Sequence, residues 1–246
     1  MKRGLVLALC SCFACASGTS DDPGVTSDAP VVPIDATVDA TRAIDATVDA
    51  TGAIDAAIDA APAPPMIAFT GDNRTAQFGG SGGATYVDAC PGGQALIGFT
   101  GSLTSATGYH GQLSSQCGAV TLVDNAGSYS VRVTSGATLA TRGILSGSAW
   151  ARTCAADQVI VGFRGRSGNL VDQLTFRCAP LIATFAGTWT ITVGSTSDLE
   201  AIGGNGGNAF AQTDCPAGQV ATIAPVRAGD GIDAFGLGCS TPIVVQ

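Results

Sequence analysis

An internal repeat with two cysteines in each copy constrains the fold of this chain more than any other feature of its sequence. The first cysteines of the three copies are Cys90, Cys154 and Cys215, and the second are Cys117, Cys178 and Cys239. Successive second cysteines are separated by the same number of residues in both intervals, and successive first cysteines are separated by nearly the same number. Repetition at a constant interval indicates one supersecondary unit that is used several times. We therefore expect three equivalent units, at about residues 66–126, 127–186 and 187–246.

Apolar and polar residues alternate within each copy, which is the period of a β-strand that buries one face. In residues 188–193 each apolar residue follows a threonine, and Val159, Val161 and Phe163 share one face of another strand. The 34 glycines and the charged fraction of 12% leave almost no segment after Ala63 with good helix propensity. The sequence therefore predicts an all-β fold with about four short strands in each unit.

The two cysteines of a unit bracket a pair of these strands, at the open end of a hairpin where cross-strand distances suit a disulfide. Six cysteines allow fifteen pairings. The threefold regularity favours pairing inside each unit, which gives Cys90 with Cys117, Cys154 with Cys178, and Cys215 with Cys239. The two cysteines of a pair are too far apart in sequence for a structural zinc site, and His110 is the only histidine. We expect no metal and no cofactor.

The N-terminal residues have the features of an export signal. Met1-Lys2-Arg3 is followed by an uncharged run to Ala14. The sequence Phe13-Ala14-Cys15-Ala16 resembles a bacterial lipobox, in which a cysteine after a small residue becomes acylated, although Cys12 replaces the usual leucine. Cleavage at the competing Leu9-Cys10-Ser11-Cys12 would leave Cys15 as an odd thiol. We predict a signal peptide over residues 1–15 with lipidation at Cys15, and Cys12 as the alternative.

Residues 16–65 are predicted to be a disordered linker. The decapeptide IDATVDATRA at residues 34–43 recurs twice with small changes, up to residue 63. Its single Ile and Val residues bury too little apolar surface to offset the entropy of ordering the backbone. Nine of the nineteen acidic residues lie in this linker, so the domain at residues 66–246, with ten acids and eight arginines, is nearly neutral. No basic stripe indicates a nucleic-acid partner.

Short motifs in the last two units resemble known families. GGNGG at residues 203–207, together with Arg227 and the loop GDGID at residues 229–233, resembles jacalin-related lectins. VGFRGRSG at residues 161–168, with Asp172 and Cys178, resembles the vitelline membrane outer layer protein I group, which carries cysteines in three Greek-key repeats. The resemblance covers roughly residues 66–246. It implies a β-prism I fold, in which three four-stranded antiparallel sheets face a common axis, here preceded by the disordered linker.

The resemblance also implies a sugar site, because jacalin-related lectins hold sugar with a glycine-rich loop and the aspartate of a Gly-x-x-x-Asp loop. A carboxylate accepts hydrogen bonds from sugar hydroxyls, and glycine lets the backbone come close. The expected carbohydrate-binding residues are Gly203, Gly204, Asn205, Gly229, Asp230 and Asp233, with a second candidate loop at Gly168 and Asp172. The first unit departs from the motif, since its loop at residues 108–112 ends in Gln112. Tight β-turns also require Gly and Asp. We predict that loop 203–207 and the carboxylate of Asp233 form one site in the third unit, although the sequence does not determine which loops face each other, because strands can be exchanged between repeats.

These features predict an exported, lipid-anchored protein of the outer membrane or cell surface that carries a lectin-like carbohydrate-binding module. Its expected partners are the membrane, through the N-terminal lipid, and glycans. The alternative is a structural or adhesive envelope protein without sugar binding. An enzyme is not expected, because Glu200 is the only glutamate, His110 is predicted to be polar surface in an exposed loop, and no nucleophile, phosphate or dinucleotide motif occurs. The sugar and the oligomeric state stay open.

Overall fold

The computed structural model describes residues 64–106 and 108–246. The predicted signal peptide, both candidate lipidation cysteines and almost all of the predicted linker lie outside the described residues. Every regular element in the described part is a β-strand, and no helix there is long and apolar enough to cross a membrane. The strands are β1 (Met66–Arg74), β2 (Phe78–Gly79), β3 (Ala84–Ala89), β4 (Gln94–Leu103), β5 (His110–Asp124), β6 (Tyr129–Thr138), β7 (Ser148–Thr153), β8 (Gln158–Ser167), β9 (Val171–Phe185), β10 (Trp189–Val193), β11 (Ser197–Asp198), β12 (Ile202–Gly203), β13 (Asn208–Asp214), β14 (Val220–Ala228), β15 (Ile232–Phe235) and β16 (Gly238–Val245).

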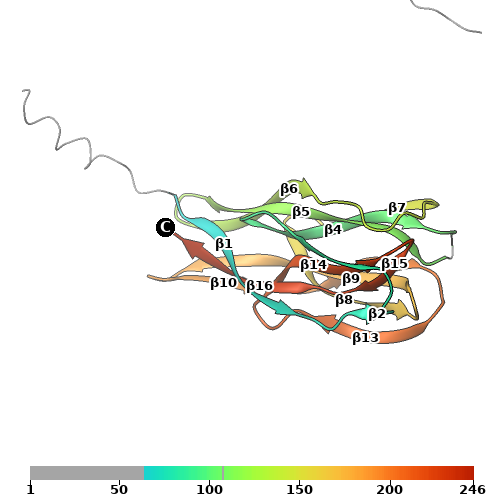
Figure 1. Ribbon diagram of the computed structural model, residues 1–246. Coiled ribbons are helices and arrows are strands. Elements are labelled where there is room, and N and C mark those ends of the chain that lie inside the picture. The colour runs from blue at the N-terminus through green and yellow to red at the C-terminus, as the bar shows by residue number, and fades with distance from the viewer. Residues whose placement is uncertain (1–63, 107) are drawn as a thin grey trace, which may run out of the picture. The chain divides into compact units, whose positions relative to one another are not determined.

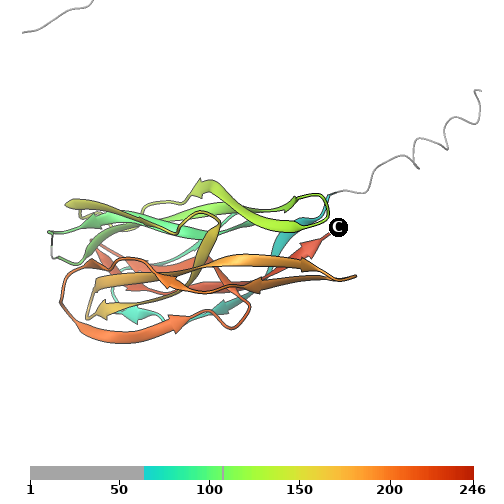
Figure 2. The same ribbon diagram turned by 180° about the vertical axis from the view of Figure 1, so that it is seen from behind.

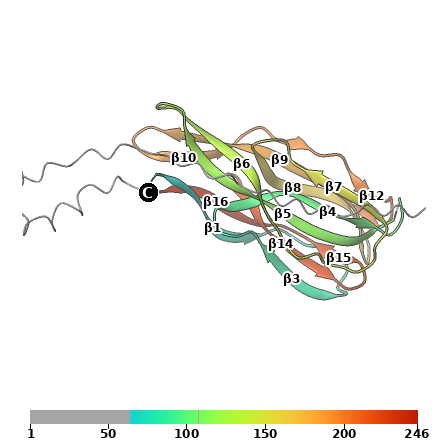
Figure 3. The same cartoon turned by 90° about the horizontal axis from the view of Figure 1, so that it is seen from above.

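The strands form three antiparallel sheets. Sheet A contains β1, β16, β14, β15 and β2 in that order, with β3 on the free edge of β14. Sheet B has the order β6-β5-β4-β7, and sheet C has the order β10-β9-β8-β13 with β11 and β12 also on β9. Each sheet is four strands wide, because the short strands of sheets A and C lie end to end and together occupy one position beside a neighbouring strand. Figures 1 and 3 show sheet B over the other two sheets, and Figure 2 shows the same layers from behind. The predicted all-β fold with three four-stranded sheets is confirmed.

The sheets do not coincide with the sequence repeats. The hairpin β4–β5 of the first unit is completed by β6 and β7 of the second, and the hairpin β8–β9 of the second unit is completed by strands of the third. The last unit has no successor, so its strands β14 to β16 pair with β1, β2 and β3 at the start of the domain. Each sheet therefore joins the central hairpin of one unit to the outer strands of the next.

The core lies between the three sheets. Phe99, Phe163, Phe176 and Phe235 are fully buried and pack together with ring centroids 4.5 to 5.9 Å apart. They come from β4, β8, β9 and β15, so all three sheets contribute to one aromatic cluster. Burying a side chain of this size contributes about 2 to 3 kcal/mol to stability, and the cluster thus holds the sheets face to face.

The three expected disulfides are present. They join Cys90 to Cys117, Cys154 to Cys178 and Cys215 to Cys239, and they close segments of 27, 24 and 24 residues. In each bond the second cysteine is at most 1% exposed. Each bond thus links the turn that precedes a central hairpin to the second strand of that hairpin.

The prediction that His110 is exposed polar surface was wrong. His110 is the first residue of β5 and is fully buried. Its Nε2 lies 3.2 Å from the carbonyl oxygen of Ile202, and its ring packs edge-on against Trp150. The matching positions in the other two sheets hold Val171 and Ile232, so the histidine occupies a place in the core.

Candidate functional site

Two similar sites lie at one end of the domain, each made of a glycine loop and a Gly-x-x-x-Asp loop. The glycine loops are residues 79–83, which begin at the last residue of β2, and residues 203–207, which begin at the last residue of β12 and lead into β13. Figure 1 shows β2, β7 and β13 gathered toward the end opposite the C-terminus. We call the site that contains Asp233 the A site and the site that contains Asp172 the C site, after their sheets.

In the A site the glycine loop 79–83 encloses the carboxylate of Asp233. Asp233 is the extra residue of a β-bulge, because Ala228 pairs with Ile232 and Arg227 pairs with Ala234. The bulge turns the carboxylate toward the glycine loop, and its Oδ2 also accepts a hydrogen bond of 2.8 Å from the N–H of Gly229 in its own loop. A Cβ atom on Gly82 or Gly83 would overlap the carboxylate oxygens. The loop can therefore approach Asp233 closely because it consists of glycines.

Arg227 holds the glycine loop of the A site in place. Its guanidinium donates hydrogen bonds to the carbonyl oxygens of Ser81, Gly82 and Gly83 at 2.6, 2.9 and 3.0 Å. A planar guanidinium can bind several carbonyls at once in a fixed geometry. The loop is thus ordered before any ligand arrives. A cavity of about 320 Å³ lies beside it, lined by Gly79, Gly80, Ser81 and Arg227 among others.

The C site has the same construction. Arg166 donates to the carbonyl oxygens of Asn205, Gly206 and Gly207 at 3.2, 2.9 and 2.8 Å. Asp172 is again the extra residue of a bulge, between Ser167 paired with Val171 and Arg166 paired with Gln173. Partial burial raises the pKa of the Asp172 carboxyl, while the N–H of Gly168 and the charge of Arg166 act in the opposite direction.

The expected combination of loop 203–207 with Asp233 was wrong. Gly203 pairs with Gln173 of β9, and a Cβ on Gly206 or Gly207 would overlap the Asp172 carboxylate. Gly203, Gly204 and Asn205 therefore belong with Gly168 and Asp172, whereas Gly229, Asp230 and Asp233 belong with loop 79–83. The reason is that the outer strands of each unit complete the sheet of the preceding unit, and those of the first unit complete the sheet of the last. The glycine loop of one unit therefore lies against the aspartate loop of another.

Sequence reasoning also missed Arg166 and the whole of loop 79–83 as site residues. The available signal was the repeat itself. Arg166 and Arg227 are separated by the same interval as Cys178 and Cys239, and both precede a Gly-x-x-x-Asp loop by the same spacing. The role of an arginine at that position cannot be inferred until the loop that it contacts is known.

Sheet B carries a third copy that lacks both charged groups. The bulge position holds Gly111, not the expected Gln112, since Leu103 pairs with His110 and Ser102 pairs with Gln112. Ser102 replaces the arginine and reaches one carbonyl of the opposite loop, that of Leu145, at 3.0 Å. The loop 143–147 exposes the apolar side chains of Ile144 and Leu145. This copy therefore has neither the carboxylate nor the arginine of the other two.

The three copies contact one another in a ring. The N–H groups of Ile144 and Leu145 both donate to the carbonyl oxygen of Asp230 at 2.9 Å. The N–H of Gly204 lies 3.1 Å from the carbonyl oxygen of Gly108, and Gly80 packs against Asn169 at the corresponding place. Each aspartate loop, or the equivalent loop 108–112 of sheet B, thus contacts a glycine loop, or the equivalent loop 143–147, of a neighbouring sheet. In the part of the chain that the structure describes, no group of three His, Cys, Asp or Glu side chains is arranged to hold a metal ion.

No protein-family model matches the chain, and no curated protein matches it. Solved structures of jacalin-related lectins are similar to it in fold. The Calystegia sepium agglutinin is 15% identical with a TM-score of 0.47, and the match covers 69% of this chain and 97% of that chain. A mannose-binding jacalin-related lectin from Ananas comosus is 17% identical with a TM-score of 0.45, covering 69% and 98%. Artocarpin complexed with Me-alpha-mannose is 15% identical with a TM-score of 0.44, covering 70% and 99%.

Proposed function

We propose that this protein binds carbohydrate at the A and C sites. The observation that carries the proposal is the repeated construction, in which an arginine-held glycine loop encloses a partly exposed carboxylate at the same end of two sheets. A carboxylate accepts charge-assisted hydrogen bonds from vicinal hydroxyls. The glycines let the loop backbone lie close against this carboxylate, so that backbone groups and the carboxylate can contact the same ligand. Because the loops are ordered in advance, binding would cost little conformational entropy.

Removing the two carboxylates tests this function. We expect Asp172→Asn and Asp233→Asn each to lower binding on a glycan array to about half, and the double variant to abolish it, because an amide loses the charge that strengthens the hydrogen bonds. Asp124→Asn, in a distant hairpin turn, is the matched control. A double variant that binds like the unmodified protein would disprove the proposal. An unmodified, fully oxidised protein without any signal would favour the alternative of a structural or adhesive envelope component.

The C site should also lose affinity in acid. We expect binding by the Asp233→Asn variant, which retains only the C site, to weaken about tenfold per pH unit below the pKa of Asp172, since protonation removes the charged acceptor. That pKa is raised above the ordinary 3.8 by burial, so the loss should begin at a higher pH than for an exposed aspartate. Titration by calorimetry would measure it, with circular dichroism at each pH to confirm folding. Affinity that does not change across this range would contradict the role of Asp172.

We further propose that the protein is exported and held at a membrane by a lipid on Cys15, so that its sugar sites face outward. The support lies in the sequence alone: the charged start, the uncharged run and the Ala14-Cys15 junction. Cys15→Ser should move the protein from the membrane fraction to the soluble fraction of fractionated cells, and Cys12→Ser should leave it in the membrane. The reverse result would assign the lipid to Cys12. Unchanged partitioning of both variants would contradict lipid anchoring.

A further inference from the structure

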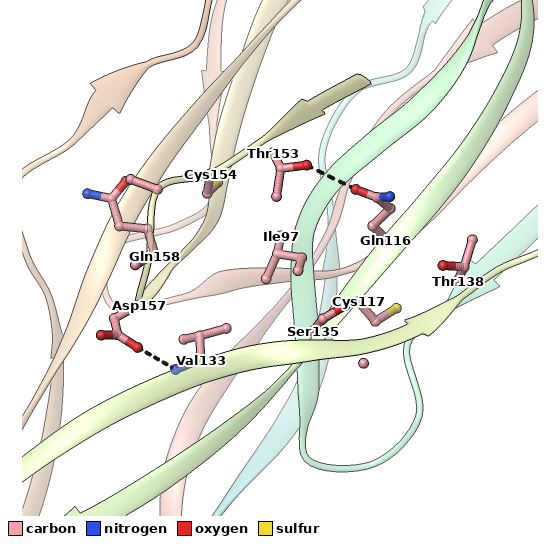
Figure 4. A pocket seen from close by; sticks show the side chains of 13 residues that line it. Ile97, Gln116, Cys117, Val133, Ser135, Thr138, Thr153, Cys154, Asp157 and Gln158 are labelled. Atoms are coloured by element: carbon pink, nitrogen blue, oxygen red, sulfur yellow. Dashed lines mark hydrogen bonds between the residues drawn. The ribbon is translucent and has the colours of Figure 1, made fainter. Parts of the chain in front are cut away.

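A cavity of about 360 Å³ lies on sheet B, away from the A and C sites (Figure 4). Ile97 of β4 and Val133 of β6 form its apolar floor. Its polar walls are Gln116, Ser135, Thr138, Thr153, Asp157 and Gln158. Ile97 and the loop end of β4 at Leu103 are six residues apart, which is about 20 Å along an extended strand. The cavity is therefore separate from the ring of glycine loops.

The equivalent place on sheet C holds a smaller cavity of about 280 Å³, which is bordered by an ionic cluster. Arg177 of β9 pairs with Asp198 of the edge strand at 2.9 Å and with Asp214 of β13 at 3.0 Å. Arg177 and Asp198 face each other in the same register as Gln116 and Thr138 in sheet B. Asp214 in turn corresponds to Thr153, since each is the last residue of its strand, directly before the cysteine.

Sheet A also places an arginine here. Arg74 pairs in register with Gly238, and its side chain lies across that glycine. Sheet B has neither an arginine nor an acid at these three positions. Its shorter neutral side chains, with Gln116 accepting a hydrogen bond of 3.0 Å from Thr153, leave a larger cavity than the equivalent ones of about 250 Å³ on sheet A and about 280 Å³ on sheet C.

Asp157 fixes one wall of the cavity. Its backbone has φ of 59°, a conformation held by Gly93 and Gly218 at the matching positions of the other two turns. Non-glycine residues rarely adopt this conformation, so its presence needs a compensating interaction. The carboxylate supplies one, because its Oδ1 accepts a hydrogen bond of 2.8 Å from the N–H of Val133 on the edge strand β6. Figure 4 shows this bond on one side of Ile97 and the pair Gln116 and Thr153 on the other.

We propose that this cavity is a second kind of binding site, for a small neutral polyhydroxylated molecule of about monosaccharide size. Hydroxyl and amide groups on opposite walls can both donate and accept, which suits hydroxyl groups, while the floor of Ile97 and Val133 suits the apolar face of a ring. The carboxylate of Asp157 is the one charge that lines the cavity, so anions are disfavoured. The inference does not depend on the A and C sites.

The test uses amide chemical shifts of the ¹⁵N-labelled, oxidised full-length protein. The probes are methyl α-mannoside, methyl β-galactoside and N-acetylglucosamine at millimolar concentration, with L-arginine and citrate as charged counterparts. We expect at least one of the neutral sugars to shift the amides of residues 133–138 and 153–158. Shifts in loops 79–83 and 203–207 report separately on the A and C sites.

Two variants decide whether the cavity causes the shifts. Gln116→Arg combined with Thr138→Asp and Thr153→Asp installs the sheet C cluster, which narrows the cavity and replaces its neutral polar wall by charges. This variant should abolish the shifts at residues 133–138, while those in the glycine loops persist. Asp157→Gly introduces the residue found at the matching position of the other two turns, so this variant should remain folded. It should weaken binding about tenfold. No shift at these amides with any sugar, or shifts with L-arginine or citrate alone, would overturn the proposal. So would binding that survives in both variants.

Discussion

Reduction of the three disulfides is expected to unfold the β-domain at room temperature. Each bond closes a segment of 24 or 27 residues, and a loop of this length contributes about 3 kcal/mol in the chain-entropy model. Three such contributions amount to roughly 9 kcal/mol, which is comparable to the whole stability of a typical domain. The glycine-rich composition adds to the effect, since glycine loses more conformational entropy on folding than any other residue. Circular dichroism in urea, with and without a phosphine reductant, would measure the loss.

A single bond can be removed to check the magnitude. The variant Cys154→Ala/Cys178→Ala should lose about 3 kcal/mol of unfolding free energy and remain folded, because the other two bonds stay closed. The same pair of changes at Cys215 and Cys239 offers a matched comparison, since both bonds close 24 residues. A fully reduced protein with an unchanged urea midpoint would show that packing alone sustains the fold.

Acid should destabilise the domain through His110. Burial lowers the pKa of this histidine from 6.5 to about 4, although the hydrogen bond to Ile202 opposes the shift. The unfolded chain therefore takes up a proton near pH 6.5, and the folded domain does so only near pH 4. The unfolding free energy should be unaffected above this window and fall by about 1.4 kcal/mol per pH unit within it. The total loss is about 3 kcal/mol.

His110→Val isolates this effect, because Val171 occupies the same place in sheet C. Between pH 6.5 and pH 4, the unfolding free energy of the variant should fall by about 3 kcal/mol less than that of the unmodified protein. Carboxylates such as Asp198, whose pKa is lowered by Arg177, also lose stabilisation in acid, but they do so equally in both proteins. The difference between the two urea titrations is thus the measurement. Parallel curves would show that the buried histidine is not the cause.

Features with a local cause could be predicted from the sequence. Alternation with period two and a high glycine content indicate strands regardless of which strands later pair. The recurrence of two cysteines in each copy predicted the three disulfides, because both members of a pair lie in one hairpin and its preceding turn. The glycine loops and the Asp172 and Asp233 loops were also recognisable, since each is a short contiguous motif.

The assembly of the sites was decided by the tertiary structure. Each glycine loop meets the aspartate of the preceding unit, because outer strands of one repeat complete the sheet of another and the first strands pair with the last. Arg166 and Arg227 acquire their role from carbonyl groups about 40 or 145 residues away. Burial of His110 depends likewise on Ile202 and Trp150 from other strands. The repeating unit, its strands and its disulfides follow from the amino-acid sequence, since strand formation depends on local alternation of apolar and polar residues and each cysteine pair lies within one copy. Which loops share a site, which polar residue is buried and how large each surface cavity is depend on contacts between copies, and these exist only after the three sheets have packed.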